Sequence, residues 1–265
     1  MSHWLETLPI TGMALVVFAA TYLVTGGIYW VVIALASGDR GRAFKAVSPG
    51  MLPPLGIIFG LLAGFLAAQV WSDSDRAQTA VNHEASALRA VVLLVESFPG
   101  EPETRMRALL RRHVDEVAMQ EWPTMAWHHA ALTMIPPRLD EALQLALALS
   151  PRGHGQVAAQ QEIVAALQNA LDARRQRIIV SRSTVNGIKW TCLLLQAVVT
   201  LLAIAMVHSE NRVTAAIAMA IFATAVAVSV VLIASHSGPF NGAISVGPDL
   251  LLQVRPEERI AGSSP

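Results

Sequence analysis

The side chains of this chain that are best suited to chemistry are histidines and carboxylates in its middle third. Imidazole nitrogens and carboxylate oxygens are common ligands of transition metals. Their spacing does not favour a metal site, because these histidines fall on different predicted helices, and adjacent histidines point to different sides of a helix. We therefore predict no metal and no other cofactor, and expect these groups at the polar surface or in hydrogen bonds between helices. The groups are His83 with Glu84, His113 with Asp115 and Glu116, and His128 with His129.

The motifs of an enzyme are also missing from the sequence. The serines lack a nucleophile-elbow context, and there is no HExxH pair, paired-carboxylate motif or phosphate-binding glycine loop. Cys192 is the only cysteine, so neither an intrachain disulfide nor a thiolate metal site can form. These observations predict that the protein is not an enzyme.

A different function, ion conduction, is suggested by an uncharged stretch from Ala46 to Ser72. It carries a small residue at every fourth position, the pattern that lets two helix backbones approach closely in lipid. We predict that this stripe is a helix-packing face, in the same chain or in another. Its members are Gly56, Gly60, Gly64 and Ala68.

The opposite face of the same helix carries a second set of residues. At about 100° per residue, Ile58, Leu62, Phe65 and Gln69 point away from the glycines. This face must then look at lipid or at a central pore. We predict a pore in which the three apolar residues form a constriction and Gln69 a polar mouth, because hydrophobic constrictions gate ion flow by dewetting and need no buried charge.

The elements that position these residues are four stretches without Asp, Glu, Lys or Arg. Each is long enough to cross a hydrocarbon core of about 30 Å as a helix of roughly 20 residues. Charged residues make up only 14% of the 265 residues and hydrophobic ones 54%. We predict an integral protein of the lipid bilayer with four membrane-spanning helices, none of which is a cleaved signal. The stretches are Thr7 to Gly38, Ala46 to Ser72, Trp190 to Ser209 and Val213 to Pro248.

No ionisable residue lies in the interior of a predicted span, whereas pumps, proton-coupled transporters and voltage sensors usually place one there. A passive channel or a plain membrane anchor therefore fits this sequence better than a pump.

Between the second and third spans lies a polar segment with helical periodicity. It predicts four helices, separated by breaks at Pro99 and Gly100, near Trp122 and Pro123, and at Pro151 to Gly153. The first and last of these helices are expected to continue the second and third spans. The apolar stripes expected on the four helices are, in order, Val81, Ala85, Leu88, Val92 and Val95; Met106, Leu110, His113 and Val117; Leu139, Leu143 and Leu147; and Val157, Val164, Leu167, Leu171 and Ile178.

The predicted fold is therefore all-α, with a helical bundle inserted between the second and third of four transmembrane helices. We expect four regions: spans one and two in residues 1–72, a helical extramembrane domain in 73–187, spans three and four in 188–236, and a turn motif with a tail in 237–265. A short extended segment from Ala243 to Val246 is expected in the last region.

Charge and composition bear on partners and location. The formal net charge is zero, without the basic patch of a nucleic-acid reader. Arginine far outnumbers lysine and alanine is abundant, which is the bias of a GC-rich bacterial genome. We therefore expect a multi-pass protein of a bacterial inner membrane with no nucleic-acid partner.

Residues along almost the whole chain resemble those of the uncharacterised bacterial proteins called bestrophin-like. The resemblance implies a more distant relation to bestrophins, and with it a homopentameric, anion-selective channel whose second span lines the pore. The residues that carry it are Phe65, Arg76, Val81, Glu84 and Ala85, Phe98 and Pro99, Leu109 to His113, Trp122, the run Gly238 to Gly242, Val246 and Pro248.

In bestrophins a Pro-Phe-Gly motif follows the last span and leads into acidic residues that bind calcium. Here Pro239 and Phe240 match the motif, but Asn241 comes before Gly242 and only Asp249 lies nearby. The resemblance therefore carries no calcium ligands over to this chain.

Orientation and one alternative function stay open. Arg40, Arg42 and Lys45 in the short first loop favour a cytoplasmic loop and an outside helical domain, whereas bestrophins have the reverse arrangement. The alternative is a membrane-anchored sensor or scaffold whose helical domain binds a partner or a small ligand.

Overall fold

The computed structural model describes residues 9–36, 48–126, 136–183, 185–241 and 244–257, and within these ranges all regular structure is helical. The predicted all-α class is confirmed. Residues 244–247 are in neither a helix nor a strand and Ala243 lies outside the described residues, so the expected extended segment stays a prediction. A short helix, α10 (Asp249–Gln253), follows.

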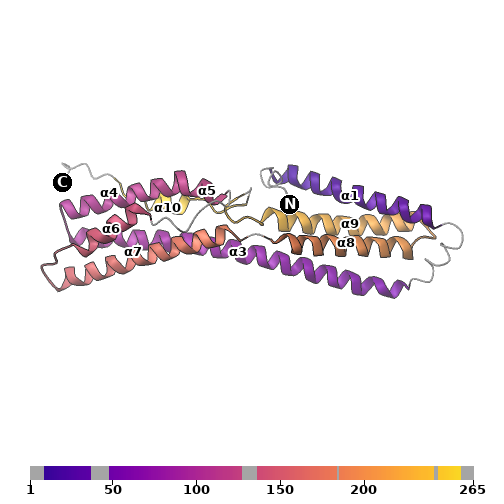
Figure 1. Ribbon diagram of the computed structural model, residues 1–265, viewed down its shortest axis with the longest axis horizontal. Coiled ribbons are helices and arrows are strands. Elements are labelled where there is room, and N and C mark those ends of the chain that lie inside the picture. Colours follow the sequence, from indigo (N-terminus) through magenta and orange to yellow (C-terminus); the bar gives the residue numbers. More distant parts are fainter. Residues whose placement is uncertain (1–8, 37–47, 127–135, 184, 242–243, 258–265) are drawn as a thin grey trace. The chain divides into compact units, whose positions relative to one another are not determined.

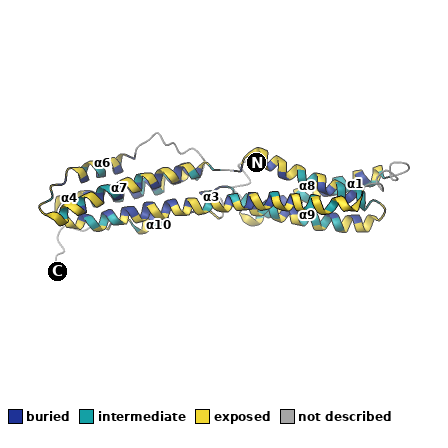
Figure 2. Cartoon of the chain, turned by 90° about the horizontal axis from the view of Figure 1, so that it is seen from below, coloured by how far each residue is buried: buried dark blue, intermediate teal, exposed yellow. Residues whose placement is uncertain are grey.

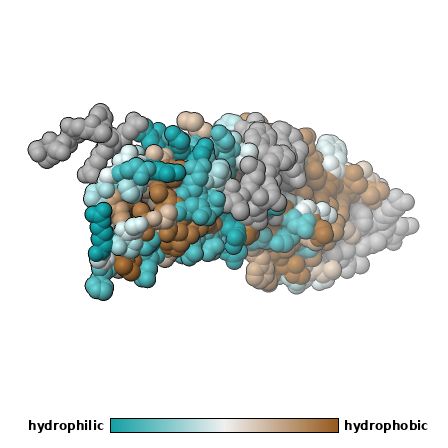
Figure 3. All heavy atoms as spheres, turned by 60° about the vertical axis from the view of Figure 1, so that its left-hand side comes forward, coloured by the Kyte–Doolittle hydropathy of each residue, from teal (hydrophilic) through white to brown (hydrophobic). Residues whose placement is uncertain are grey.

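The chain divides into two compact units. The first, here called the membrane unit, comprises residues 1–72, 184–237 and 242–244; the second, the helical unit, comprises 73–183, 238–241 and 245–265. Hydrophobic side chains cover much of the visible surface over the membrane unit, and hydrophilic ones are frequent over the helical unit (Figure 3).

Four apolar helices belong to the membrane unit, and each is long enough to span a bilayer. They are α1 (Ile10–Leu35), the N-terminal part of α3 (Leu52–Leu94), α8 (Gly187–Val207) and α9 (Arg212–Ser235). In Figure 1, α1, α8 and α9 run side by side, and the ring of Phe59 on α3 meets that of Phe222 on α9 edge-to-face at 5.3 Å. The protein is therefore a multi-pass membrane protein.

Helix α3 is one continuous helix of 43 residues, as the sequence predicts for the second span and its extension. At about 1.5 Å per residue it is roughly twice as long as a hydrocarbon core of about 30 Å is thick. The uncharged part ends at Ser72, and Asp73, Asp75 and Arg76 follow it directly. The part of α3 that begins at Asp73 is charged, and its place outside the membrane stays a prediction.

The last helix of the helical unit is not continuous with the third span, which corrects the prediction. Helix α7 (His154–Ser181) ends five residues before α8 begins at Gly187. The side chain of Asn186 accepts a hydrogen bond from the backbone N–H of Ile188 at 3.1 Å. Asparagine is a favoured N-cap because its side-chain oxygen satisfies a backbone donor that the first turn leaves free, and this cap starts a new helix.

The helical unit begins with the remainder of α3 and continues through α4 (Glu101–Glu116), a π-helical turn from Val117 to Glu121, α5 (Trp122–Ala126), α6 (Pro137–Leu147) and α7. Gly100 turns the chain into α4 at φ +96°, a conformation that only glycine adopts without strain. The second predicted helix does not end near Trp122 and Pro123, since α5 continues through them.

The core of the helical unit follows most of the predicted stripes, whose buried residues are dark blue in Figure 2. The stripe residues of the first two predicted helices are buried, except that Val92 is half-buried. Two positions were wrong: Leu147 is 57% exposed and Val157 is 40% exposed. Ala142 and Ala146 of α6 and Ile163 of α7 take the buried positions instead.

Candidate pore face and buried ion cluster

In the membrane unit, α3 packs through one face. This face is buried against residues of α8 and α9, among them Leu193, Ala197 and Val226. Because residues three and four apart share one side of a helix, a single narrow stripe holds α3 in the bundle. The stripe consists of Phe59, Ala63, Leu66, Ala67 and Val70.

The predicted pore-lining residues lie beside the buried stripe, although Leu62 also packs against the core that the stripe helps to form. Phe65 is 72% exposed and Ile58 52%, while Leu62 and Gln69 are half-buried. An apolar face of this size on one chain needs lipid or another protein surface to cover it. The structure is thus compatible with either lipid or a central pore in front of these four residues.

The small-residue stripe is exposed as well. Gly60, Gly64 and Ala68 are exposed and Gly56 is half-buried. A Cβ atom added at any of the three glycines would meet no atom within 4 Å in the described part of the chain. No residue in the described part of the chain makes a close helix contact along this stripe, and the packing role stays a prediction.

Gln69 has a partner that sequence reasoning missed. The Nζ atom of Lys189, in the first turn of α8, donates a hydrogen bond to Oε1 of Gln69 at 2.5 Å. Both residues belong to the membrane unit. The structure thereby brings a cation to the end of the Ile58 to Gln69 face.

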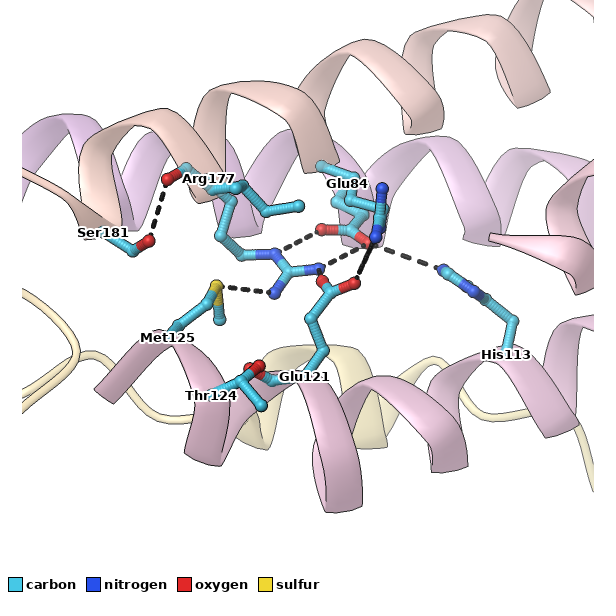
Figure 4. Close-up of polar contacts among 9 residues, drawn as sticks. Glu84, His113, Glu121, Thr124, Met125, Arg177 and Ser181 are labelled. Carbon is cyan, nitrogen blue, oxygen red and sulfur yellow. Dashed lines mark hydrogen bonds and ion pairs between the residues drawn. The ribbon is translucent and has the colours of Figure 1, made fainter. Parts of the chain in front are cut away.

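A buried cluster of ions lies in the core of the helical unit (Figure 4). Arg177 of α7 and Glu84 of α3 are both 0% exposed and form a two-pronged ion pair, with Nε to Oε2 at 2.7 Å and Nη2 to Oε1 at 3.2 Å. Arg177 also donates to Glu121 at 2.6 Å, and Arg174 binds the other oxygen of Glu121 at 2.6 Å. Two carboxylates and two guanidinium groups therefore balance in charge.

His113 of α4 completes this cluster from the other side. Its Nε2 atom lies 3.6 Å from Oε1 of Glu84, too far for a hydrogen bond, and has no other partner among the described residues. The sequence analysis expected Glu84 and His113 at the surface or in contacts between helices, and the structure places both between helices in the core. His83, by contrast, is exposed.

The environment of Glu84 keeps it ionised. Burial by itself raises the pKa of this carboxyl, but the charge and hydrogen bonds of Arg177, together with His113, outweigh burial and lower the pKa from 4.5 to about 2. The pKa of Arg177 is raised, because its two glutamate partners outweigh the effect of burial. Glu84 and Arg177 are therefore both charged at neutral pH.

We expect the stability of the helical unit to fall with acid because of Glu84. A group whose folded-state pKa is lowered stabilises the fold above its unfolded pKa and loses that contribution as the pH falls through the folded pKa. For Glu84 this window runs from about pH 4.5 down to about pH 2 and involves on the order of 3 kcal/mol. Thermal unfolding at several pH values checks this, with Glu84→Gln as the comparison. An equal decline in both proteins over this window would contradict the assignment to Glu84.

The motif after the last span docks onto this cluster. Phe240 is buried and meets the ring of Trp122 edge-to-face at 5.5 Å. The indole N–H of Trp122 donates to the carbonyl of Val246 at 3.1 Å, and the guanidinium of Arg177 lies 4.8 Å from the centre of the Trp122 ring. Pro239 accepts a hydrogen bond from the Val246 N–H at 2.8 Å. Gly242 lies outside the described residues, as do His128 and His129.

No group of three or more histidines, cysteines and carboxylates in the described ranges could hold a metal ion. The loop charges Arg40, Arg42 and Lys45, on which the predicted orientation depends, lie outside the described residues.

A comparison with protein families matches the Bestrophin-like domain over residues 19–251. The chain belongs to the bestrophin-like family. The match covers both units of the bestrophin-like chain, including the Ile58 to Gln69 face, the ion cluster and the motif at Pro239 and Phe240. No protein of curated function matches the chain.

Solved structures share this bestrophin-like fold. The chain is similar to a bacterial bestrophin homolog from Klebsiella pneumoniae with a TM-score of 0.68 and 11% identity, covering 89% of this chain and 95% of that one. A leucine-to-threonine variant of a bacterial bestrophin homolog from the same organism gives a TM-score of 0.68 and 14% identity over 90% and 96%. At these identities the likeness establishes the fold.

Proposed function

We propose that this protein is one subunit of an oligomeric channel for small anions in a bacterial inner membrane, with α3 lining the pore. The observation that carries the proposal is the exposure of Ile58 and Phe65 on a helix that is anchored to its own bundle by a different face. Membership of the bestrophin-like family supports it, and by resemblance the assembly is a homopentamer.

The two exposed faces of α3 fit an assembly of copies. The small-residue stripe offers a surface on which a neighbouring helix can pack closely. The Ile58 to Gln69 face would then surround the axis, where Leu62 and Phe65 form a hydrophobic constriction.

This face lacks the charged ligands of a cation-selective pore, and it carries no Arg or Lys of its own that would attract anions. Cation-selective pores use rings of Asp or Glu side chains, or backbone carbonyls, as ligands. The face from Ile58 to Gln69 holds no carboxylate, and its carbonyls are engaged within α3. Ions would pass it by partial dehydration against apolar walls.

We expect Phe65→Ala and Leu62→Ala to raise halide efflux from liposomes that hold the purified protein severalfold over wild type. Truncation widens the constriction and makes it easier to wet. The control is Leu23→Ala, which removes an apolar side chain that is 76% exposed on α1, and which should leave efflux unchanged.

If none of these proteins conducts while all are folded and oligomeric, the channel proposal is wrong. The sensor or scaffold function would then be the better account of the helical unit. If Leu23→Ala raises efflux as much as Phe65→Ala, leakage through a loosened bundle would explain the flux, and α3 would lose its assigned role.

A further inference from the structure

We infer that Lys189 supplies the positive charge that makes the pore select anions, and that Gln69 holds its ammonium group at the pore mouth. This inference rests on the proposed function of the Ile58 to Gln69 face and names the residue that selects the permeating ion.

The position of Lys189 follows from two contacts within the membrane unit. Its ammonium group is bound to Oε1 of Gln69 at 2.5 Å. Gln69 comes four residues after Phe65, and therefore about one helical turn further along the same face of α3. The charge thus lies at the end of the apolar constriction, where an ion would enter or leave it.

The charge of Lys189 is not neutralised by a carboxylate in the described ranges, where none of the ion pairs includes it. Within the described part of the membrane unit, the other charged residues are Glu210 and Arg212, beyond the opposite end of α8. The nearest carboxylate along α3 is that of Asp73, one helical turn beyond Gln69, and it forms an ion pair with Arg76 at 3.7 Å. The partner of Lys189 is a neutral amide, which orients the ammonium group but leaves its full charge to act on ions.

Helix stability does not explain this lysine. Lys189 lies in the first turn of α8, where the helix dipole is positive and disfavours a cation. The N-terminus of α8 adds its own partial positive charge at the same place. The remaining ordinary explanation is a lysine that anchors the helix at the membrane interface, and such an anchor would not affect ion selection.

The test compares reversal potentials under a potassium chloride gradient, in bilayers that hold wild type, Lys189→Gln, Lys189→Glu or Lys189→Arg. Because surface charges act within a Debye length of about 10 Å at 0.1 M salt, we expect Lys189→Gln to lower the chloride-to-potassium permeability ratio by about threefold or more. Lys189→Glu should lower it further, and Lys189→Arg should keep it. At 1 M salt, where the Debye length is about 3 Å, the differences should shrink.

Two further variants make the result specific. Gln69→Leu removes the acceptor that orients the ammonium group and should lower the ratio part of the way. Arg212→Gln removes the same charge beyond the other end of α8 and should leave the ratio unchanged.

An unchanged ratio in Lys189→Glu, with wild-type conductance, would overturn this inference and make Lys189 an interfacial anchor only. No conductance from folded wild type would overturn the channel proposal itself. The two failures are therefore distinguished in the same experiment.

Discussion

Arg177→Met is expected to lower the free energy of unfolding by about 3–5 kcal/mol, because removal of one partner leaves buried carboxylates without compensation. Arg177 is 0% exposed and neutralises both Glu84 and Glu121. For a chain of this size the midpoint of thermal unfolding should fall by on the order of 10 °C. The measurement is the thermal unfolding of the detergent-purified protein, followed by tryptophan fluorescence.

The same helix offers a matched control for Arg177→Met. Arg175 pairs with Asp172 at 3.4 Å, and their side chains are 66% and 67% exposed. Exposed pairs of this kind contribute about 0–1 kcal/mol, so Arg175→Met should leave the midpoint almost unchanged. The double variant Glu84→Gln with Arg177→Met should recover part of the loss, since it removes the charge that is left unpaired. A double variant no more stable than Arg177→Met would show that lost packing sets the cost.

The spans and most of the helices could be predicted because each rests on a local pattern. Absence of charge over 20 residues or more predicts a helix in lipid, because a helix satisfies its backbone polar groups internally. Proline and glycine at Pro99 and Gly100 end a helix whatever surrounds it. The break before α8 was missed because Asn186 was not recognised as an N-cap, a signal that the sequence does contain.

The sequence analysis left Glu84 and His113 either at the surface or between helices, and it did not pair Glu84 with the arginines of α7. The position of a residue on its helix predicts its burial better than its residue type does here. Glu84 lies on the apolar stripe of Val81, Ala85 and Leu88, at the spacing of a buried helix face. On α7, Arg174 and Arg177 likewise continue the buried stripe of Ile163, Leu167 and Ala170. A carboxylate on one such stripe and arginines on another predict a buried pair, although not which helices meet.

The pore face shows a different limit of sequence reasoning. Helical geometry places Ile58 and Phe65 on a different side of α3 from Gly60 and Gly64, but it could not show that α3 packs through a third face. Which stripe of an almost uniformly apolar helix faces its neighbours depends on how side chains interlock, and not on their polarity. The contact of Lys189 with Gln69 could not be predicted either, because 120 residues separate the two side chains and no local pattern brings them together.

Phe240→Ala is expected to cost about 3–5 kcal/mol, as do other truncations of buried aromatic residues. Its ring is 5% exposed and packs against Trp122, in the core where α10 also docks through Leu251. Hydrogen exchange should therefore rise at the amides of α10 before it rises elsewhere, because local openings begin where few buried contacts remain.

Trp122→Phe distinguishes the ring contact with Phe240 from the hydrogen bond to Val246. It keeps an aromatic ring against Phe240 but removes the N–H donated to Val246, which leaves a buried carbonyl without its partner and costs roughly 1–3 kcal/mol. The expected order of stability is wild type, then Trp122→Phe, then Phe240→Ala. If α10 in Phe240→Ala exchanges no faster than in wild type, the segment is held by other contacts, such as the ion pair of Arg255 with Asp115 at 2.9 Å. In that case the motif at Pro239 and Phe240 would serve the core around Trp122 and not the attachment of the C-terminal segment.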